Sequence, residues 1–68
     1  MYNTDIILDN IEQLLIEKNI PKMQFYKDIG MSAGSFGDWR SGRSNPSKKT
    51  LIKLANYFNS SIDDLYKS

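Results

Sequence analysis

The 68-residue sequence contains neither cysteine nor histidine, and each absence removes a class of chemistry. Without cysteine the chain has no disulfide and no thiolate metal site, so its folding does not depend on the redox compartment. Without histidine it lacks the usual general base near neutral pH and the commonest metal ligand. The remaining residues assemble no nucleophile–base pair and no metal cluster, so we expect no enzyme, no cofactor and no small-molecule ligand.

Long apolar runs are also absent. No run approaches the ~20 residues that a membrane span needs, and the first residues, Met1 to Asp5, lack the basic region of a signal peptide. A cytoplasmic protein with no membrane contact is therefore expected. The length suffices for one domain, so we expect residues 1–68 to form a single unit.

The net charge of +1 conceals an uneven distribution of charge along the chain. From Trp39 to Ile62 there are five basic residues and no acid, whereas the rest of the chain has four lysines against eight acids, a balance of −4. A basic segment on an acidic scaffold is typical of a surface that meets a polyanion. Ordinary solvated helix charges would give the same pattern. The basic residues of the segment are Arg40, Arg43, Lys48, Lys49 and Lys53.

Apolar spacing and capping residues predict helices and no strand. Thr4, Ser32 and Ser47 suit N-caps. Pro21 suits the first turn of a helix, where its missing N–H costs nothing, and Gly30 suits a left-handed residue that ends one. The predicted helices cover residues 5–18, 21–28, 33–40 and 48–58, followed by a short last helix that Ser61-Ile62-Asp63-Asp64 opens and that includes Leu65 and Tyr66.

Some apolar residues allow two interpretations. Trp39 could stack on bases, but its spacing of three from Phe36 favours a place in the core. The first helix has apolar residues at Ile6, Leu8 and Ile16 besides its buried stripe. This excess indicates either a wide core face or a contact surface for a second subunit or another domain.

Two short helices joined by a tight turn at Gly30-Met31-Ser32 form a helix-turn-helix. From about Ile11 to Leu65 the sequence resembles the Cro/C1-type, or XRE, helix-turn-helix family. The resemblance implies an all-α, compact five-helix bundle, a lambda-repressor-like DNA-binding domain with its third helix in the major groove. The matching pieces are Ile29-Gly30-Met31-Ser32, Trp39-Arg40-Ser41-Gly42-Arg43-Ser44-Asn45-Pro46-Ser47, Thr50-Leu51-Ile52-Lys53-Leu54-Ala55 and Ser61-Ile62-Asp63-Asp64-Leu65.

A helix in the major groove reads base edges with its N-terminal residues. Here these are Ala33, Gly34 and Ser35, with Asp38 one turn on. Ser35 can donate or accept a hydrogen bond, Ala33 can touch a thymine methyl and Gly34 permits close approach, although Ala33 and Gly34 can equally be spacers. Asp38 can accept from a cytosine amino group or orient Arg40. Family members often have Gln, Arg or Lys at several of these positions. This sequence has small residues there instead, so it offers few side chains that can read bases.

Contacts to phosphate are better supplied. Pro21 and Lys22 begin the second helix, where backbone N–H groups and the helix dipole favour an anion. Such contacts fix register without reading sequence. Lys53 lies further along the fourth helix and can be merely solvated. The candidate phosphate contacts are Lys22, Arg40, Arg43, Ser44, Asn45, Lys48 and Lys49.

Tyr26 departs from the resemblance, because the family usually has a small Ala at this position of the second helix. Either the second and third helices stand further apart, or Gly34 or Gly37 makes room for the ring.

The predicted function is a sequence-specific, double-stranded DNA-binding transcriptional regulator. We expect a repressor that acts as a homodimer and reads the major groove with helix 33–40, in the cytoplasm of a bacterium or of a phage-infected host cell. The alternative is a protein-interaction or antitoxin-type module with weak DNA readout, which the thin reading helix favours. Family-like dimer contacts would lie around Tyr57, Ile62, Leu65 and Tyr66.

Overall fold

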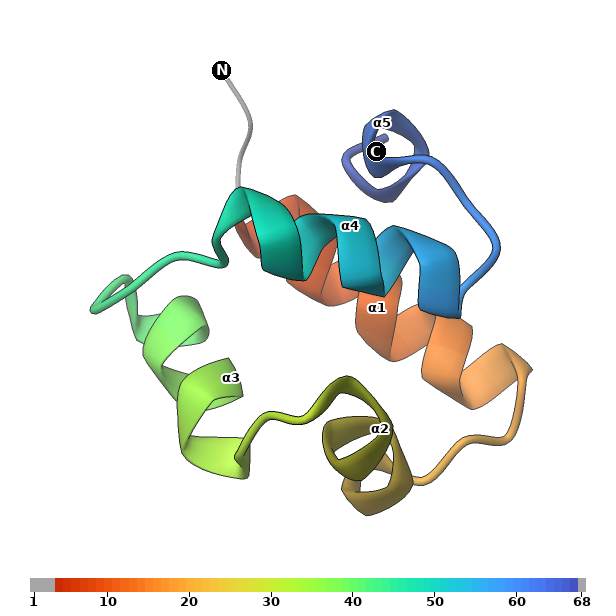
Figure 1. Cartoon of the computed structure of the whole chain (residues 1–68), viewed down its shortest axis with the longest axis horizontal. Coiled ribbons are helices and arrows are strands. Elements are labelled where there is room, and N and C mark those ends of the chain that lie inside the picture. Colours follow the sequence, from red (N-terminus) through yellow and green to blue (C-terminus); the bar gives the residue numbers. More distant parts are fainter. Residues whose placement is uncertain (1–3, 68) are drawn as a thin grey trace.

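Five helices joined by short loops account for residues 4–67, the part of the chain that the structure, a computed structural model, describes. No strand occurs in this part, so the predicted all-α bundle is confirmed, and the first four helices lie within one residue of their predicted bounds. In Figure 1 the remaining helices are arranged around α1 and α4, with α3 at one side, α2 below and α5 above. The helices are α1 (Thr4–Glu17), α2 (Lys22–Ile29), α3 (Ala33–Ser41), α4 (Lys48–Tyr57) and α5 (Ile62–Leu65).

The first four helices all end in the same way. A residue with positive φ follows each of them: Asn19 at 56°, Gly30 at 83°, Gly42 at 82° and Asn59 at 53°. The left-handed conformation turns the chain so that the next N–H donates to the carbonyl five residues back. This bond supplies a partner for a carbonyl that the end of the helix would leave without one. These bonds run from Ile20 to Leu15, Met31 to Tyr26, Arg43 to Asp38 and Ser60 to Ala55, at 2.8–2.9 Å.

Serine hydroxyls cap the starts of α3, α4 and α5. Each Oγ accepts a hydrogen bond from the backbone N–H three residues on, which satisfies a donor that the first turn of a helix leaves open. The predicted caps Ser32 and Ser47 and the capping pattern at Ser61 are therefore confirmed. The distances are 3.3 Å from Ser35 to Ser32, 3.2 Å from Thr50 to Ser47 and 3.1 Å from Asp64 to Ser61.

Two predicted helix starts are wrong by one residue. Thr4 is the first residue of α1 rather than its cap, and its hydroxyl donates to Asn45 Oδ1 at 3.1 Å. Pro21 is the N-cap of α2 rather than its first residue, because its ψ of 142° is extended although its φ of −63° suits a helix. The helix consequently begins at Lys22.

Phe25 forms the centre of the core and has no exposed surface. Its ring is stacked on Phe58 at 5.8 Å and meets Phe36 edge-on at 6.5 Å, which joins α2 to α3 and to the end of α4. Trp39 is only 7% exposed and lies 6.2 Å from Phe36. The predicted core role of Trp39 is thus confirmed, and its ring does not present a face for stacking on bases.

Tyr26 is accommodated between α2 and α3 without help from a glycine. The half-buried ring lies 6.0 Å from that of Phe36, between ring centroids. A Cβ atom at Gly37 would have no neighbour within 4 Å, and one at Gly34 would meet only Ser32 Oγ at 3.7 Å. The expected compensation at these glycines is therefore wrong, because neither faces the tyrosine ring.

Helix α1 buries a wide apolar face. Ile7, Leu8, Ile11 and Leu15 are at most 3% exposed. Of the three residues of the apolar excess, Leu8 therefore belongs to the core, Ile6 is half-buried and Ile16 is 70% exposed. No helix within residues 4–67 combines the length and hydropathy needed to cross a membrane.

The polar side of α1 fastens the end of the chain. The Asn10 amide donates to the carbonyl of Leu65 and, at 2.7 Å, to that of Lys67. Because Leu65 is only 1% exposed and Tyr57, Ile62 and Tyr66 pack against the same core, this region presents little apolar surface for a dimer contact.

Candidate nucleic-acid interface

Helix α3 has one face in the core and one face open to solvent. Phe36 and Trp39 point inward, whereas Ala33, Gly34 and Gly37 are exposed. The open face therefore presents almost bare backbone, with no long side chain over most of its length. Such a surface can approach another molecule closely.

The two polar residues proposed to read bases differ in availability. Ser35 is half-buried, and its hydroxyl lies 3.3 Å from that of Ser32, so it belongs partly to the cap of α3. The Asp38 carboxylate is 45% exposed and lies 3.9 Å from Arg43 Nη1. Asp38 does not orient Arg40, which corrects that part of the prediction: its charged neighbour is Arg43, beyond the turn that ends α3.

The loop from α3 to α4 is anchored through its backbone. The carbonyl of Asp38 accepts the N–H groups of Arg43 at 2.9 Å and of Ser44 at 3.3 Å. This turn leaves the Arg43 side chain 81% exposed, beside the last turn of α3. Ser44 and Asn45 are exposed as well, and Asn45 Oδ1 accepts a hydrogen bond from the hydroxyl of Thr4.

Besides Arg43, two of the candidate phosphate contacts have acidic partners, and the partners of both lie on α1. Arg40 lies 3.0 Å from Asp9, 3.6 Å from Glu12 and 3.9 Å from Asp5, all carboxylates of α1. Lys22 lies 3.2 Å from Glu12 and 5.8 Å from the centre of the Phe36 ring. The charges of both residues are thus largely balanced before any ligand arrives.

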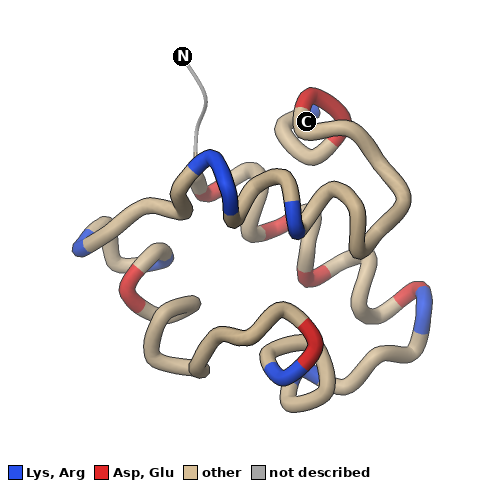
Figure 2. Tube along the Cα trace, viewed as in Figure 1, with Lys and Arg blue, Asp and Glu red and all other residues tan. Residues whose placement is uncertain are grey.

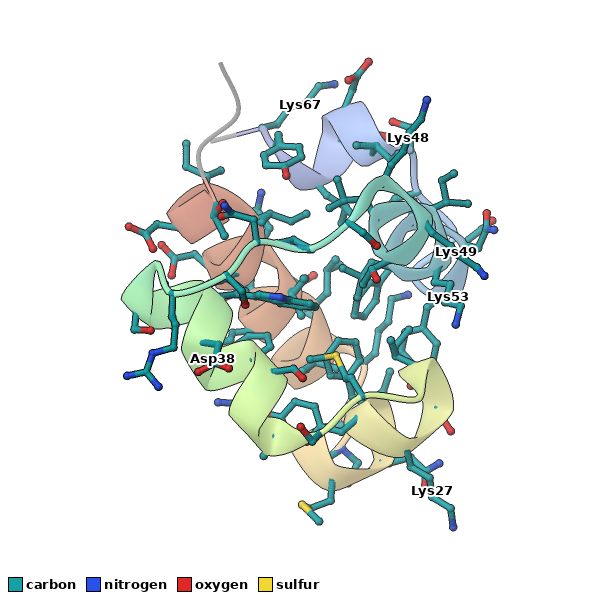
Figure 3. All side chains as sticks on the ribbon, turned by 60° about the vertical axis from the view of Figure 1, so that its left-hand side comes forward. Lys27, Asp38, Lys48, Lys49, Lys53 and Lys67 are labelled. Carbon is teal, nitrogen blue, oxygen red and sulfur yellow. The ribbon has the colours of Figure 1, made fainter. Side chains whose placement is uncertain are left out.

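The lysines of α4 have no ion pair within residues 4–67, unlike Arg40 and Lys22. Figure 2 shows the basic positions along α4 and acidic positions along α1. In Figure 3, Lys48, Lys49 and Lys53 extend from α4 on one side of the view, Lys27 of α2 lies below them, and Asp38 of α3 lies toward the other side. The free positive charge is therefore concentrated on α4, beside the helix-turn-helix.

The sequence model of one protein family, the Cro/C1-type HTH DNA-binding domain, matches residues 10–67. The chain belongs to the Cro/C1-type helix-turn-helix family. No curated protein and no solved structure matches it. Membership identifies α2 and α3 as the helix-turn-helix and double-stranded DNA as the class of partner.

Three exposed residues that the sequence did not lead us to assign to the interface, Lys27, Gly37 and Lys53, lie on the helix-turn-helix or on α4. Gly37 follows Gly34 by three residues and continues the open face of α3, a spacing visible in the sequence. Lys53 is exposed on α4 and lines a cavity of about 400 Å³ between α2 and α4 with Asp28, Ile29, Asn56 and Tyr57. Lys27 was not singled out because nothing in the sequence links α2 to the side of the fold on which α4 presents its lysines.

Proposed function

We propose that the chain is a sequence-specific transcriptional regulator that represses by occupying double-stranded DNA. Helix α3 would lie in the major groove, with Ala33, Gly34, Ser35 and Asp38 toward the base edges. The proposal implies a protein of the cytoplasm of a bacterium or of a phage-infected cell.

One observation carries the proposal. The outward face of α3, the second helix of the motif, is uncovered, and the loop after α3 leads to Lys48 and Lys49 of α4, which are exposed and have no ion pair within residues 4–67. Lys48 and Lys49 would contact phosphates while α3 reads bases, and Arg43, Ser44 and Asn45 lie between the two elements. Lys22 and Arg40 are less available, because acids of α1 hold both.

We further propose that two copies bind together on a two-fold-related operator. A reading face of small residues offers few base contacts, and a second half-site about one helical turn away would roughly double them. DNA shape would supply part of the remaining specificity.

Selection from a random duplex pool at low salt tests the proposal. The expected result is enrichment of a two-fold-related sequence, with half-sites about 10 base pairs apart. Asp38→Asn should then change the preferred base at one position of each half-site, whereas Lys49→Gln should weaken all sequences alike. Failure to retain any duplex at low salt would contradict the proposal.

A protein-interaction or antitoxin-type module is the second candidate, and the bare face of α3 favours it. The absence of long polar side chains there suits close packing against another protein as well as against bases. This candidate predicts that Gly37→Arg abolishes capture of a protein partner while any weak DNA binding persists. Loss of selected-duplex binding by the same variant supports the DNA-reading role instead.

A further inference from the structure

Three carboxylates of α1 form a row along one side of that helix. Asp5, Asp9 and Glu12 are spaced by four and three residues, which places them on one face. Their row passes the end of α3 and the start of α2, where it meets Arg40 and Lys22. We call the three acids the acidic row.

Glu12 connects the two helices of the motif. Its Oε1 lies 3.2 Å from Lys22 Nζ, and its Oε2 lies 3.6 Å from Arg40 Nη2. One carboxylate thus contacts the first residue of α2 and the last turn of α3 at once. Asp9 adds the shortest contact, at 3.0 Å from Arg40 Nη1.

Helix α3 needs such an attachment. It buries only Phe36 and Trp39, and it contains two glycines that weaken it as a helix. The guanidinium of Arg40, planar and rich in donors, can bond several carboxylates in a fixed geometry. A single exposed ion pair contributes little, but one guanidinium shared by three acids is a network.

We infer that Arg40 is a positioning residue, which sets the angle of α3 through the acidic row of α1 instead of contacting DNA. The side chain of Arg40 is 38% exposed and contacts three acids on one face of α1, whereas that of Arg43 is 81% exposed. A phosphate would have to displace those carboxylates to reach Arg40. This inference rests on the proposed DNA-binding function.

The test compares Arg40→Gln, Arg40→Glu, and Arg40→Glu combined with Asp9→Arg in the full chain. Each is titrated with the selected duplex and with a scrambled duplex of the same composition, over a range of salt, at a temperature where circular dichroism shows it folded. Arg43→Gln is the matched control, since an exposed phosphate contact should lower the salt slope by about 0.9.

For Arg40→Gln the inference predicts about tenfold weaker binding of the selected duplex, as expected when a base contact is lost. Binding of the scrambled duplex and the salt slope should stay unchanged. Arg40→Glu should be weaker still, and adding Asp9→Arg should recover about tenfold, because the ion pair reforms with its charges exchanged.

Three results would overturn the inference. A slope lowered by about 0.9 in Arg40→Gln would make Arg40 a phosphate contact. If folded Arg40→Gln bound the selected duplex as tightly as the wild type, Arg40 would only stabilise the fold. If the double variant did not recover affinity, Arg40 would not act through the acidic row. Failure of the proposed function would look different, because the wild-type chain itself would then bind no duplex at low salt.

Discussion

Gly34 and Gly37 are two glycines within the nine residues of α3, and no neighbouring atom requires either of them. A glycine inside a helix costs about 1 kcal/mol relative to alanine. The core gains nothing from them. Close approach of DNA to the α3 backbone, as in the proposed function, would account for both.

Gly37→Ala should therefore raise stability and weaken DNA binding together. The added methyl improves helix propensity by about 1 kcal/mol, which for a domain of this size raises the melting temperature by roughly 4–8 °C. Thermal unfolding followed by circular dichroism measures the first effect, and titration of the selected duplex measures the second. Gly30→Ala is the control and should destabilise, because its φ of 83° disfavours any side chain. If Gly37→Ala were stabilised but bound the selected duplex as tightly as the wild type, Gly37 would not be part of the DNA interface.

Tyr57 should make the stability of the fold sensitive to alkaline pH. Burial and the 2.7 Å hydrogen bond to Asp28, whose charge also opposes ionisation, raise the pKa of Tyr57 from 10.0 to about 12. The folded chain thus holds the phenol proton more tightly than the unfolded chain does. The resulting stabilisation is complete below pH 10 and is lost as the pH rises toward 12.

Urea unfolding of the wild type and of Tyr57→Phe across this range checks the expectation. The advantage of the wild type over Tyr57→Phe should shrink steadily between pH 10 and about 12. The comparison matters because burial also raises the pKa of Tyr66, which both proteins share. A constant difference between the two proteins would show that Tyr57 ionises normally in the folded chain.

At the scale of the elements, local chemistry determines where helices begin and end. Ser47 is typical, since its Oγ accepts from Thr50 N–H at 3.2 Å and lies 3.0 Å from Thr50 Oγ1. Ser47→Ala should lower the free energy of unfolding by about 1 kcal/mol. Ser47→Asp should keep most of the wild-type stability, because a carboxylate also accepts the capping hydrogen bond and interacts favourably with the positive end of the helix dipole. Chemical denaturation of the three proteins measures this, and equal losses in both variants would exclude the cap as the cause.

The first turn of α4 should contribute to DNA binding without selecting a sequence. Lys48→Gln and Lys49→Gln should each reduce the salt slope by about 0.9 and weaken selected and scrambled duplexes by the same factor. Lys18→Gln is the matched control: Lys18 is an exposed lysine at the end of α1, outside the candidate interface, and its loss should leave the slope unchanged. An equal reduction in all three variants would indicate a general charge effect instead of defined contacts.

The sequence predicted the helices and the caps because these depend on neighbours along the chain. Ser32, Ser47 and Gly30 act within one turn, so their roles are readable locally. The partners of Arg40 were not predictable in this way, because Asp9 is 31 residues away and meets it only when α1 packs on α3. The base-reading assignment remains a prediction, since it depends on a second molecule.

At the scale of the whole molecule, the basic residues fall into two groups, those with acidic partners within the chain and those without. Part of the positive charge, on Lys22 and Arg40, is balanced inside the chain by the acidic row. The lysines of α4, in contrast, have no ion pair within residues 4–67 and are available to an external anion. The acids of α1 therefore reduce the number of cations available to the proposed DNA contact, and they also join α1 to α2 and α3.

The free chain should be a monomer that pairs only on DNA. A stable dimer contact buries about 800 Å² per partner, roughly a sixth of the 4587 Å² surface of the chain. The large apolar side chains exposed within residues 4–67 are only Ile16, Met23 and Ile52, and the lysines of α4 flank Ile52. Sedimentation equilibrium should give a monomer mass without DNA and two copies per operator with it. A stable dimer in the absence of DNA would contradict this expectation.

The measurement that tests the central claim most directly is the salt dependence of wild-type binding to duplex DNA, followed by fluorescence anisotropy. Lys22 and Arg40 are held by acids of α1, whereas the side chain of Arg43 is 81% exposed and Lys48 and Lys49 have no ion pair within residues 4–67. The plot of log affinity against log salt should therefore have a slope of about −3 per bound chain. A slope near zero, or no binding at low salt, would contradict the account of this chain as a DNA-binding regulator.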